Sequence, residues 1–217
     1  MNPISKVRPT PGARRPTPGP APRGFSLIEL LVTAALIGIL SVMMFGFGSA
    51  RRQRTQKTLC QDNLQKIYLA LQIYAKDFND RLPSATNAAT SEEVLDPLVP
   101  RYSADTSLFI CPGGRDAARS SGASLRQGKI SYAYYQGRRL EDPRAAQLAL
   151  MSDRQVNTRA KQTGEPVFSA TGRSPGNNHH KFGGNFLMGD GSVQSSPPLA
   201  AFPLELPPGV TLLNPNP

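Results

Sequence analysis

Tryptophan is missing from this chain of 217 residues, and charged side chains make up only 18% of it. Proline and glycine are plentiful, with 21 and 19 residues. This composition disfavours a large close-packed core and favours a small, loop-rich domain. Cysteine is also rare: Cys60 and Cys111 allow at most one intramolecular disulfide and cannot make a four-ligand zinc site alone.

Acidic residues are fewer than basic ones, 15 against 25, which gives a formal net charge of +10. Half of this excess lies in residues 1–24, where no acidic residue balances Lys6, Arg8, Arg14, Arg15 and Arg23. The rest of the chain carries the remaining +5. The charge of the whole chain therefore overstates the case for a nucleic-acid partner, and we consider one unlikely.

Patterns typical of catalysis are absent from the sequence. We find no Ser, His and Asp in the order of a hydrolase and no paired catalytic carboxylates. The glycine-bearing stretch "PGGRDAARSSG" (112–122) lacks the GxxxxGK[ST] spacing of a phosphate-binding loop. We therefore expect that the protein is not an enzyme.

A long uncharged run extends from Leu30 to Ala50. At 1.5 Å per residue it would form a helix of roughly 31 Å, about the thickness of the hydrocarbon core of a bilayer. The apolar region of a secretory signal peptide is shorter and precedes a cleavage site with small residues. Residues 25–50 are therefore predicted to be a transmembrane helix. Basic residues flank the run on both sides, so the charges leave its orientation open.

The stretch "RGFSLIELLVTAALIGIL" (23–40) resembles the class III signal of type IV prepilins and type II secretion pseudopilins. That signal has a basic leader ending in Gly, then usually Phe, with Glu at the fifth position of the mature chain; Gly24, Phe25 and Glu29 match it. The resemblance implies that prepilin peptidase cleaves between Gly24 and Phe25 and that Phe25 is then N-methylated. Residues 1–24 would be the leader, which its prolines predict to be disordered.

The resemblance also implies an orientation and an assembly role. The N-terminus would be cytoplasmic, in a single-pass inner-membrane protein whose head is periplasmic, or extracellular after filament assembly. A carboxylate in an apolar segment needs a partner. Cleavage exposes a cationic amino group on Phe25, and in the family the Glu of an incoming subunit is held to meet the amine of its neighbour. The alternative is that Glu29 only snorkels to the membrane surface.

Apolar residues three and four positions apart form a stripe after the uncharged run: Cys60, Leu64, Ile67, Leu71, Tyr74 and Phe78. This spacing predicts an amphipathic helix, and Pro83 predicts its end near Asp80. We expect one long helix from about Phe25 to about Asp80, as in pilins. Its second half, within residues 51–82, would pack on the soluble domain.

The rest of the chain predicts a small antiparallel sheet. Strand candidates are "SLFIC" (107–111), "ISYAYY" (130–135) and "QLALMS" (147–152), while "SEEVLDPLVPRYS" (91–103) predicts a short helix and loop. In "NFLMGDGSVQ" (185–194), Asp190 and Gly191 predict the turn of a hairpin. The expected class is α+β and pilin-like, with a head domain at 83–194 and an irregular, Pro-rich C-terminal tail at 195–217.

A second resemblance involves "CQDNLQKIYLALQIYAKDFNDRLP" (60–83). It is similar to a pseudopilin-like group in which a Cys-x-x-Asn-Leu helix precedes a Cys-Pro segment, here "LFICP" (108–112), and a C-terminal His-x9-Asp-Gly element. That element would be His180, Asp190 and Gly191. We interpret Asp190 as the turn residue and expect His180 to hydrogen-bond a neighbouring loop.

A metal site is a weaker hypothesis for the same region. Four residues could be combined into one: His179, His180, Asp153 and Asp190. By analogy with major pseudopilins, whose C-terminal loops bind calcium through oxygen ligands, Asp190 is the residue to expect at calcium. No other cofactor is expected.

Cys60 and Cys111 would lie outside the cytosol, where disulfides persist. A bond between them would tie the amphipathic helix to the head and contribute about 4 kcal/mol in the loop-entropy model. Buried free thiols and a redox role are the alternatives.

These features favour a structural subunit of a type IV pilus-like or type II secretion pseudopilus filament. Its partners would be prepilin peptidase, other pilin or pseudopilin subunits, and an inner-membrane assembly platform with its ATPase. The alternative is a membrane-anchored pilin-like binding module that contacts DNA or polysaccharide through a basic loop: Arg115, Arg119, Arg126 and Lys129. Salt-sensitive DNA binding would favour that alternative.

Overall fold

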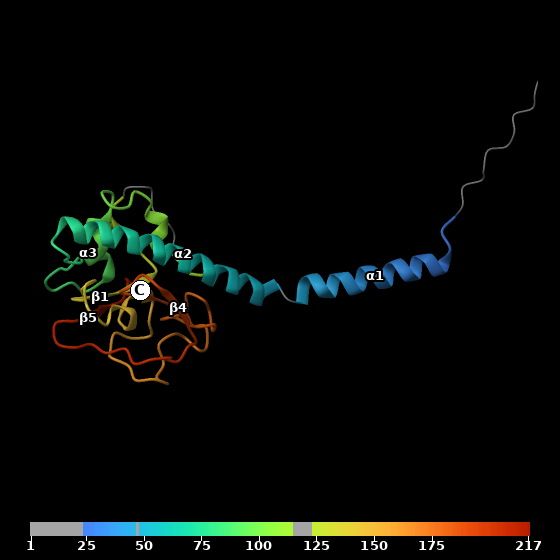
Figure 1. The fold of residues 1–217 in the computed structure, drawn as a ribbon. Coiled ribbons are helices and arrows are strands. Elements are labelled where there is room, and N and C mark those ends of the chain that lie inside the picture. The colour runs from blue at the N-terminus through green and yellow to red at the C-terminus, as the bar shows by residue number, and fades with distance from the viewer. Residues whose placement is uncertain (1–23, 47, 115–122) are drawn as a thin grey trace, which may run out of the picture. The chain divides into compact units, whose positions relative to one another are not determined.

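The computed structural model describes residues 24–46, 48–114 and 123–217 (Figure 1). The expected disordered leader therefore lies outside the described residues, apart from Gly24. The chain divides into two units, Met1–Phe47 and Gly48–Pro217. The second unit is the head domain, and it includes the segment that the sequence assigned to a helical continuation.

Helix α1 (Leu27–Gly46) lies in the first unit. Its first turn begins at Ser26, whose carbonyl accepts the backbone N–H of Leu30 at 3.1 Å. Within the described residues, Leu27–Met44 is the one stretch of helix long and apolar enough to cross a membrane, with a mean hydropathy of 2.4. The apolar side chains of Leu27–Met44 are exposed, as expected for a helix that contacts lipid.

Helix α2 (Gly48–Asp77) begins the second unit. The sequence predicted one helix over both segments, but the structure has two, and Phe47 between them lies outside the described residues. Glycine has a low helix propensity, so Gly46 and Gly48 explain a boundary at this point. The helix ends close to the predicted position, where Asn79 and Asp80 adopt positive φ.

The predicted stripe on α2 faces the core along most of its length. Cys60, Leu64, Ile67 and Leu71 are completely buried. Phe78, by contrast, follows the end of the helix and is 44% exposed. The amphipathic pattern therefore identified the packed face of α2 correctly up to its last turn.

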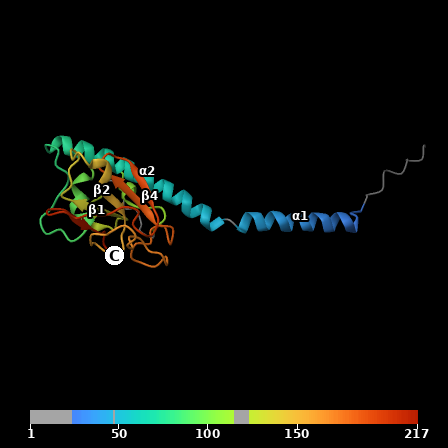
Figure 2. The same ribbon diagram turned by 60° about the horizontal axis from the view of Figure 1, so that its bottom comes forward.

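Within the part of the chain that the structure describes, the sheet has five antiparallel strands in the order β4-β3-β2-β1-β5. They are β1 (Tyr132–Gln136), β2 (Ala149–Asp153), β3 (Gly184–Met188), β4 (Val193–Ser196) and β5 (Thr211–Leu213). Figure 2 shows α2 running across the sheet. Successive side chains of a strand point to opposite faces, so Tyr132 and Tyr134 join the core with α2. Tyr135 joins a second core with Phe168 and Phe186.

Most strand predictions are correct, but the one at 107–111 is wrong. That segment forms a 3₁₀ helix, η2 (Thr106–Phe109), because Asp105 caps it. The Asp105 carboxylate accepts the backbone N–H of Ser107 at 2.9 Å, which stabilises a helical turn. The predicted short helix in 91–103 is present as α3 (Ser91–Leu95), followed by η1 (Asp96–Leu98). Two further 3₁₀ turns are η3 (Leu125–Gln127) and η4 (Ala145–Gln147).

The C-terminal segment predicted to be irregular, 195–217, contains the end of β4 and the three residues of β5. Strand β5 pairs with β1, and Leu212 and Leu213 are buried because β1 would otherwise leave an unpaired, apolar edge. A residue of α3 also binds this segment: the buried Glu92 carboxylate accepts the backbone N–H of Asn216 at 3.0 Å. The head domain therefore comprises residues 48–217 and not 83–194 alone.

Candidate functional site

The predicted processing residues lie in one short exposed segment. Gly24, Phe25 and Ser26 precede α1 and belong to no helix or strand. Phe25 is 80% exposed, and a Cβ at Gly24 would meet nothing within 4 Å. The two residues beside the expected cleavage site are thus exposed. Glu29 is exposed in the first turn of α1, where the helix dipole favours a carboxylate.

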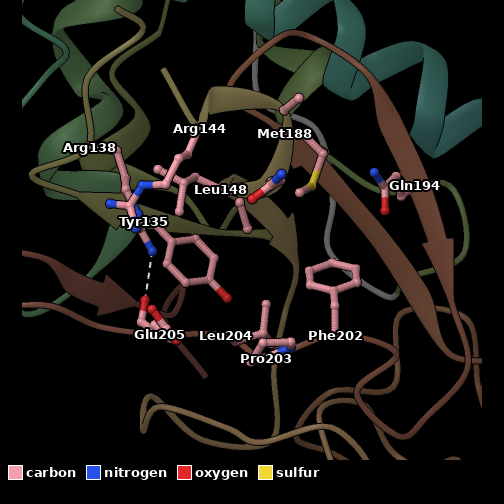
Figure 3. Close-up of a pocket in the computed structure, with 13 residues that line it drawn as sticks. Tyr135, Arg138, Arg144, Leu148, Met188, Gln194, Phe202, Pro203, Leu204 and Glu205 are labelled. Atoms are coloured by element: carbon pink, nitrogen blue, oxygen red, sulfur yellow. Dashed lines mark hydrogen bonds between the residues drawn. The ribbon is translucent and has the colours of Figure 1, made fainter. Parts of the chain in front are cut away.

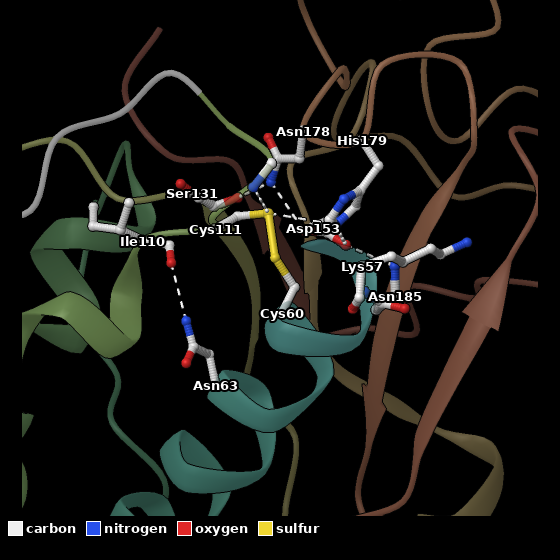
Figure 4. The surroundings of a disulfide bond; sticks show 11 residues. Lys57, Cys60, Asn63, Ile110, Cys111, Ser131, Asp153, Asn178, His179 and Asn185 are labelled. Carbon is white, nitrogen blue, oxygen red and sulfur yellow. Dashed lines mark hydrogen bonds and ion pairs between the residues drawn. A yellow bond between two sulfur atoms is a disulfide. The ribbon is translucent and has the colours of Figure 1, made fainter. Parts of the chain in front are cut away.

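A disulfide joins α2 to the loop after η2 (Figure 4). Cys60 lies on the buried face of α2, and Cys111 follows 51 residues later, with the two Cα atoms 5.4 Å apart. One turn along α2, the Asn63 side chain donates to the Ile110 carbonyl at 3.0 Å. Together these contacts fix the loop against the helix.

Asp153, the last residue of β2, is the centre of a buried polar network beside the disulfide (Figure 4). Its Oδ2 accepts the backbone N–H of Asn185 at 2.7 Å, and its Oδ1 accepts the side-chain N–H of Asn178 at 3.0 Å. His179 Nε2 lies 3.2 Å from Oδ2 of Asp153 and 3.4 Å from Sγ of Cys111. These contacts offset the cost of burying the carboxylate.

The structure brings together two of the four residues that the sequence suggested as a metal set. His180 and Asp190 are exposed, and neither belongs to a group of three or more potential ligands in the described ranges. A calcium ion at Asp190 therefore stays a prediction. His179 and Asp153 belong to a group whose potential ligand atoms all lie within 4.8 Å of one another, here called the cysteine–histidine cluster: Cys60, Cys111, Asp153 and His179.

Lys57 anchors α2 to the far edge of the sheet. Its ammonium donates to the carbonyls of Phe182 and Ser196, each at 3.1 Å, and its own carbonyl accepts the Asn185 side chain. Burial lowers the pKa of Lys57, and the Asp153 carboxylate partly opposes this shift.

The predicted hairpin turn docks on α2. Asp190 accepts the backbone N–H of Ser192 at 2.9 Å, and the Ser192 hydrogen bonds lower the pKa of Asp190. The Tyr68 hydroxyl donates to the Gly189 carbonyl at 3.1 Å. Burial raises the pKa of Tyr68. Gly191 has φ of +86°, and a Cβ there would lie 2.4 Å from a ring carbon of Tyr68.

Gly191→Ala is expected to lower the free energy of unfolding by about 2 kcal/mol or more, because it combines a strained φ with a clash against Tyr68. Gly164→Ala is the matched control, since Gly164 has φ of +89° but open space around its Cβ position. Chemical denaturation of the full chain in detergent measures both. Equal losses in the two variants would show that the contact with Tyr68 is unimportant.

His180 also lies in a tight turn. Its φ is +56°, and a Cβ at Gly172 would come 2.5 Å from its Nε2, so the ring covers the Gly172 backbone. The expected hydrogen bond from His180 to a neighbouring loop stays a prediction. His180 and the pair Asp190–Gly191 thus lie in two separate turns, one over Gly172 and one over α2.

Two residues of the basic loop contact other segments of the head. Arg126 pairs with Asp96 at 3.3 Å, and Lys129 donates to the backbone carbonyl of Pro217. Arg115 and Arg119 lie outside the described residues. The described part of this loop therefore holds other segments of the head together, which gives no support to a ligand-binding surface.

A cleft of about 420 Å³ opens on the face of the sheet opposite α2 (Figure 3). Tyr135, Phe202 and Met188 contribute its apolar walls. The Arg138 guanidinium lies 6.0 Å from the Tyr135 ring and donates to the Glu205 carbonyl at 2.6 Å. An aromatic wall beside a cation suits a small anionic or aromatic group. Sequence reasoning missed this cleft because its lining comes from several distant segments.

Residues 21–45 match the family model described as the prokaryotic N-terminal methylation motif. The match contains Gly24, Phe25 and Glu29 and most of α1, and it confirms the resemblance to a type IV prepilin-like signal. Comparison with curated proteins and with solved structures gave no match. The second resemblance, to a group with a His-x9-Asp-Gly element, stays a prediction.

Proposed function

We propose that this chain, which carries the signal of a type IV pilin-like or pseudopilin precursor, is a structural subunit of a type IV pilus-like or type II secretion pseudopilus filament. The observation that carries the proposal is the N-terminal methylation motif at residues 21–45. The subunit catalyses no reaction itself. Its function is to be processed, stored in the inner membrane and packed against copies or relatives of itself.

The geometry around the motif supports processing. Gly24 and Phe25 are exposed just before α1, so a membrane-bound peptidase can reach the bond between them. Cleavage there would leave α1 at the very start of the mature chain. The new N-terminal amine would be cationic and only four residues from Glu29.

The apolar surface of α1 supports both storage and assembly. Leu27–Met44 can span the inner membrane as a single-pass anchor before assembly. In a filament the same surface would pack against the helices of neighbouring subunits. In an apolar environment Glu29 needs a positive partner, and the methylated amine of an adjacent subunit would provide one.

The head domain supports export. Its disulfide belongs to an oxidising compartment, and the compact unit Gly48–Pro217 contains both ends of that bond. We infer that the N-terminus is cytoplasmic and the head periplasmic, or extracellular once assembled. The partners would be prepilin peptidase, other pilin or pseudopilin subunits and the assembly platform with its ATPase.

Mass spectrometry of the mature N-terminus tests the proposal first. In membranes of cells that contain prepilin peptidase, we expect the chain to begin at N-methylated Phe25. Gly24→Val should remain a precursor, because a branched side chain then occupies the position before the scissile bond. Gly38→Val is the matched control, since Gly38 in α1 also has open space around it and should be processed normally. An intact wild-type N-terminus, or cleavage after residue 50, would contradict the proposal.

A further inference from the structure

We propose that the dithiol form of the head domain binds one Zn²⁺ ion at the cysteine–histidine cluster. The ligands would be Sγ of Cys60 and Cys111, Nε2 of His179 and a carboxylate oxygen of Asp153. The cluster would then have two mutually exclusive states, a disulfide and a metal centre. This inference is independent of the filament function, because it concerns only the head.

The distances suit a tetrahedral site. Ligand bonds of about 2.0–2.3 Å place the ligand atoms of tetrahedral zinc roughly 3.3–3.8 Å apart. His179 Nε2 already lies 3.4 Å from Cys111 Sγ and 3.2 Å from Asp153 Oδ2. All four ligand atoms lie within 4.8 Å of one another. Once the disulfide is reduced, rotation about the Cα–Cβ bonds of the two cysteines can separate their sulfurs.

The choice of residue types also suits zinc. Two thiolates, one imidazole and one carboxylate are all common zinc ligands, and four protein ligands make a closed, structural type of site. The cluster is inaccessible to solvent, with each of its four residues at most 1% exposed. Such a buried position suits a structural metal ion and leaves no room for substrate.

The two ring nitrogens of His179 have different surroundings. Its Nδ1 is buried and has no hydrogen-bond partner among the described residues. Nε2, by contrast, lies 3.2 Å from Oδ2 of Asp153 and 3.4 Å from Sγ of Cys111, so it is the nitrogen placed to bind an ion between these two atoms. Nδ1 stays unsatisfied in either state, so it does not distinguish the disulfide from the metal centre.

The surroundings of Asp153 would hold the carboxylate in place as a ligand. Asn178 and the backbone of Asn185 donate to its two oxygens. Donors of this kind orient metal-binding carboxylates and tune affinity. Two thiolates, one carboxylate and Zn²⁺ sum to a charge of −1, which the nearby ammonium of Lys57 can balance.

Each of the two states forms by a reaction in which protons and electrons are accounted for. Binding of Zn²⁺ to the dithiol releases two thiol protons to solvent. Formation of the disulfide instead passes two electrons and two protons to an oxidised dithiol partner by thiol–disulfide exchange, and it expels the metal. Either state ties α2 to the loop after η2, so the metal could hold the head folded before oxidation.

Zinc analysis of the full chain in detergent tests the inference. The protein is reduced with a trialkylphosphine, which takes oxygen from water to become the phosphine oxide, and the two thiols are counted. After exposure to zinc and removal of unbound metal, we expect about one zinc per dithiol chain and almost none per disulfide chain. A folded dithiol chain without zinc would overturn the proposal.

Variants then identify the ligands. His179→Gln should weaken zinc binding by more than roughly tenfold, because it removes a direct ligand. His180→Gln is the matched control, since the neighbouring His180 is exposed and outside the cluster, and it should bind zinc like the wild type. If His179→Gln binds as tightly as the wild type, the assigned site is wrong. Cobalt in place of zinc adds a second readout in the wild type, where a thiolate-to-cobalt charge-transfer band is expected and its absence would also overturn the site.

Discussion

Glu29→Ala is expected to leave cleavage before Phe25 intact and to reduce incorporation into filaments by roughly tenfold or more. Hydrogen bonds to charged groups contribute about 1.5–3 kcal/mol, and each 1.4 kcal/mol is a factor of ten in an equilibrium constant. The substitution removes the carboxylate that would pair with the amine of a neighbouring subunit. It leaves the apolar surface of α1, and hence membrane insertion, unchanged or improved.

The measurement compares sedimented filaments with membranes in cells that have the peptidase and the assembly platform. Thr33→Ala is the matched control: Thr33 lies one turn further along α1, and its hydroxyl donates to the Leu30 carbonyl of the same helix at 3.0 Å. Normal incorporation of Glu29→Ala would favour the alternative in which Glu29 merely reaches the membrane surface. Failure of cleavage would instead show that the peptidase requires the Glu29 side chain to recognise its substrate.

Loss of the disulfide is expected to lower the free energy of unfolding of the head by about 4 kcal/mol, from the entropy of the chain segment that it closes. The double variant Cys60→Ala/Cys111→Ala removes both thiols, so no metal can replace the bond. The entire effect should appear in the head, because both cysteines lie in the unit Gly48–Pro217. Chemical denaturation of the full chain in detergent, followed by circular dichroism, measures it.

Thr58→Ala is the matched control for this double variant. Thr58 lies on the exposed side of α2, and its hydroxyl donates to the Arg54 carbonyl of the preceding turn at 3.3 Å. Its effect should stay within about 0.5 kcal/mol. An unchanged transition in the double variant would mean that the buried contacts around Asp153 suffice to hold α2 to the sheet.

The sequence alone determined the features that depend on residues close together in the chain. Gly24, Phe25 and Glu29 lie within six consecutive positions, and the methylation motif confirms what their spacing indicated. The spacing of apolar residues identified the buried face of α2, because a helix repeats its faces at a fixed period. Asp190 and Gly191 identified the β3–β4 turn, because few residue pairs accept its backbone conformation.

Only the tertiary structure decided which distant residues meet. Cys60, Asp153 and His179 come from α2, the end of β2 and the loop before β3, and no periodicity in the sequence relates them. Strand β5 was missed for a similar reason. Its three residues are too few to show an alternating pattern, and its strand conformation depends on pairing with β1. Contacts between distant segments depend on how the elements pack, and that information is spread over the whole chain.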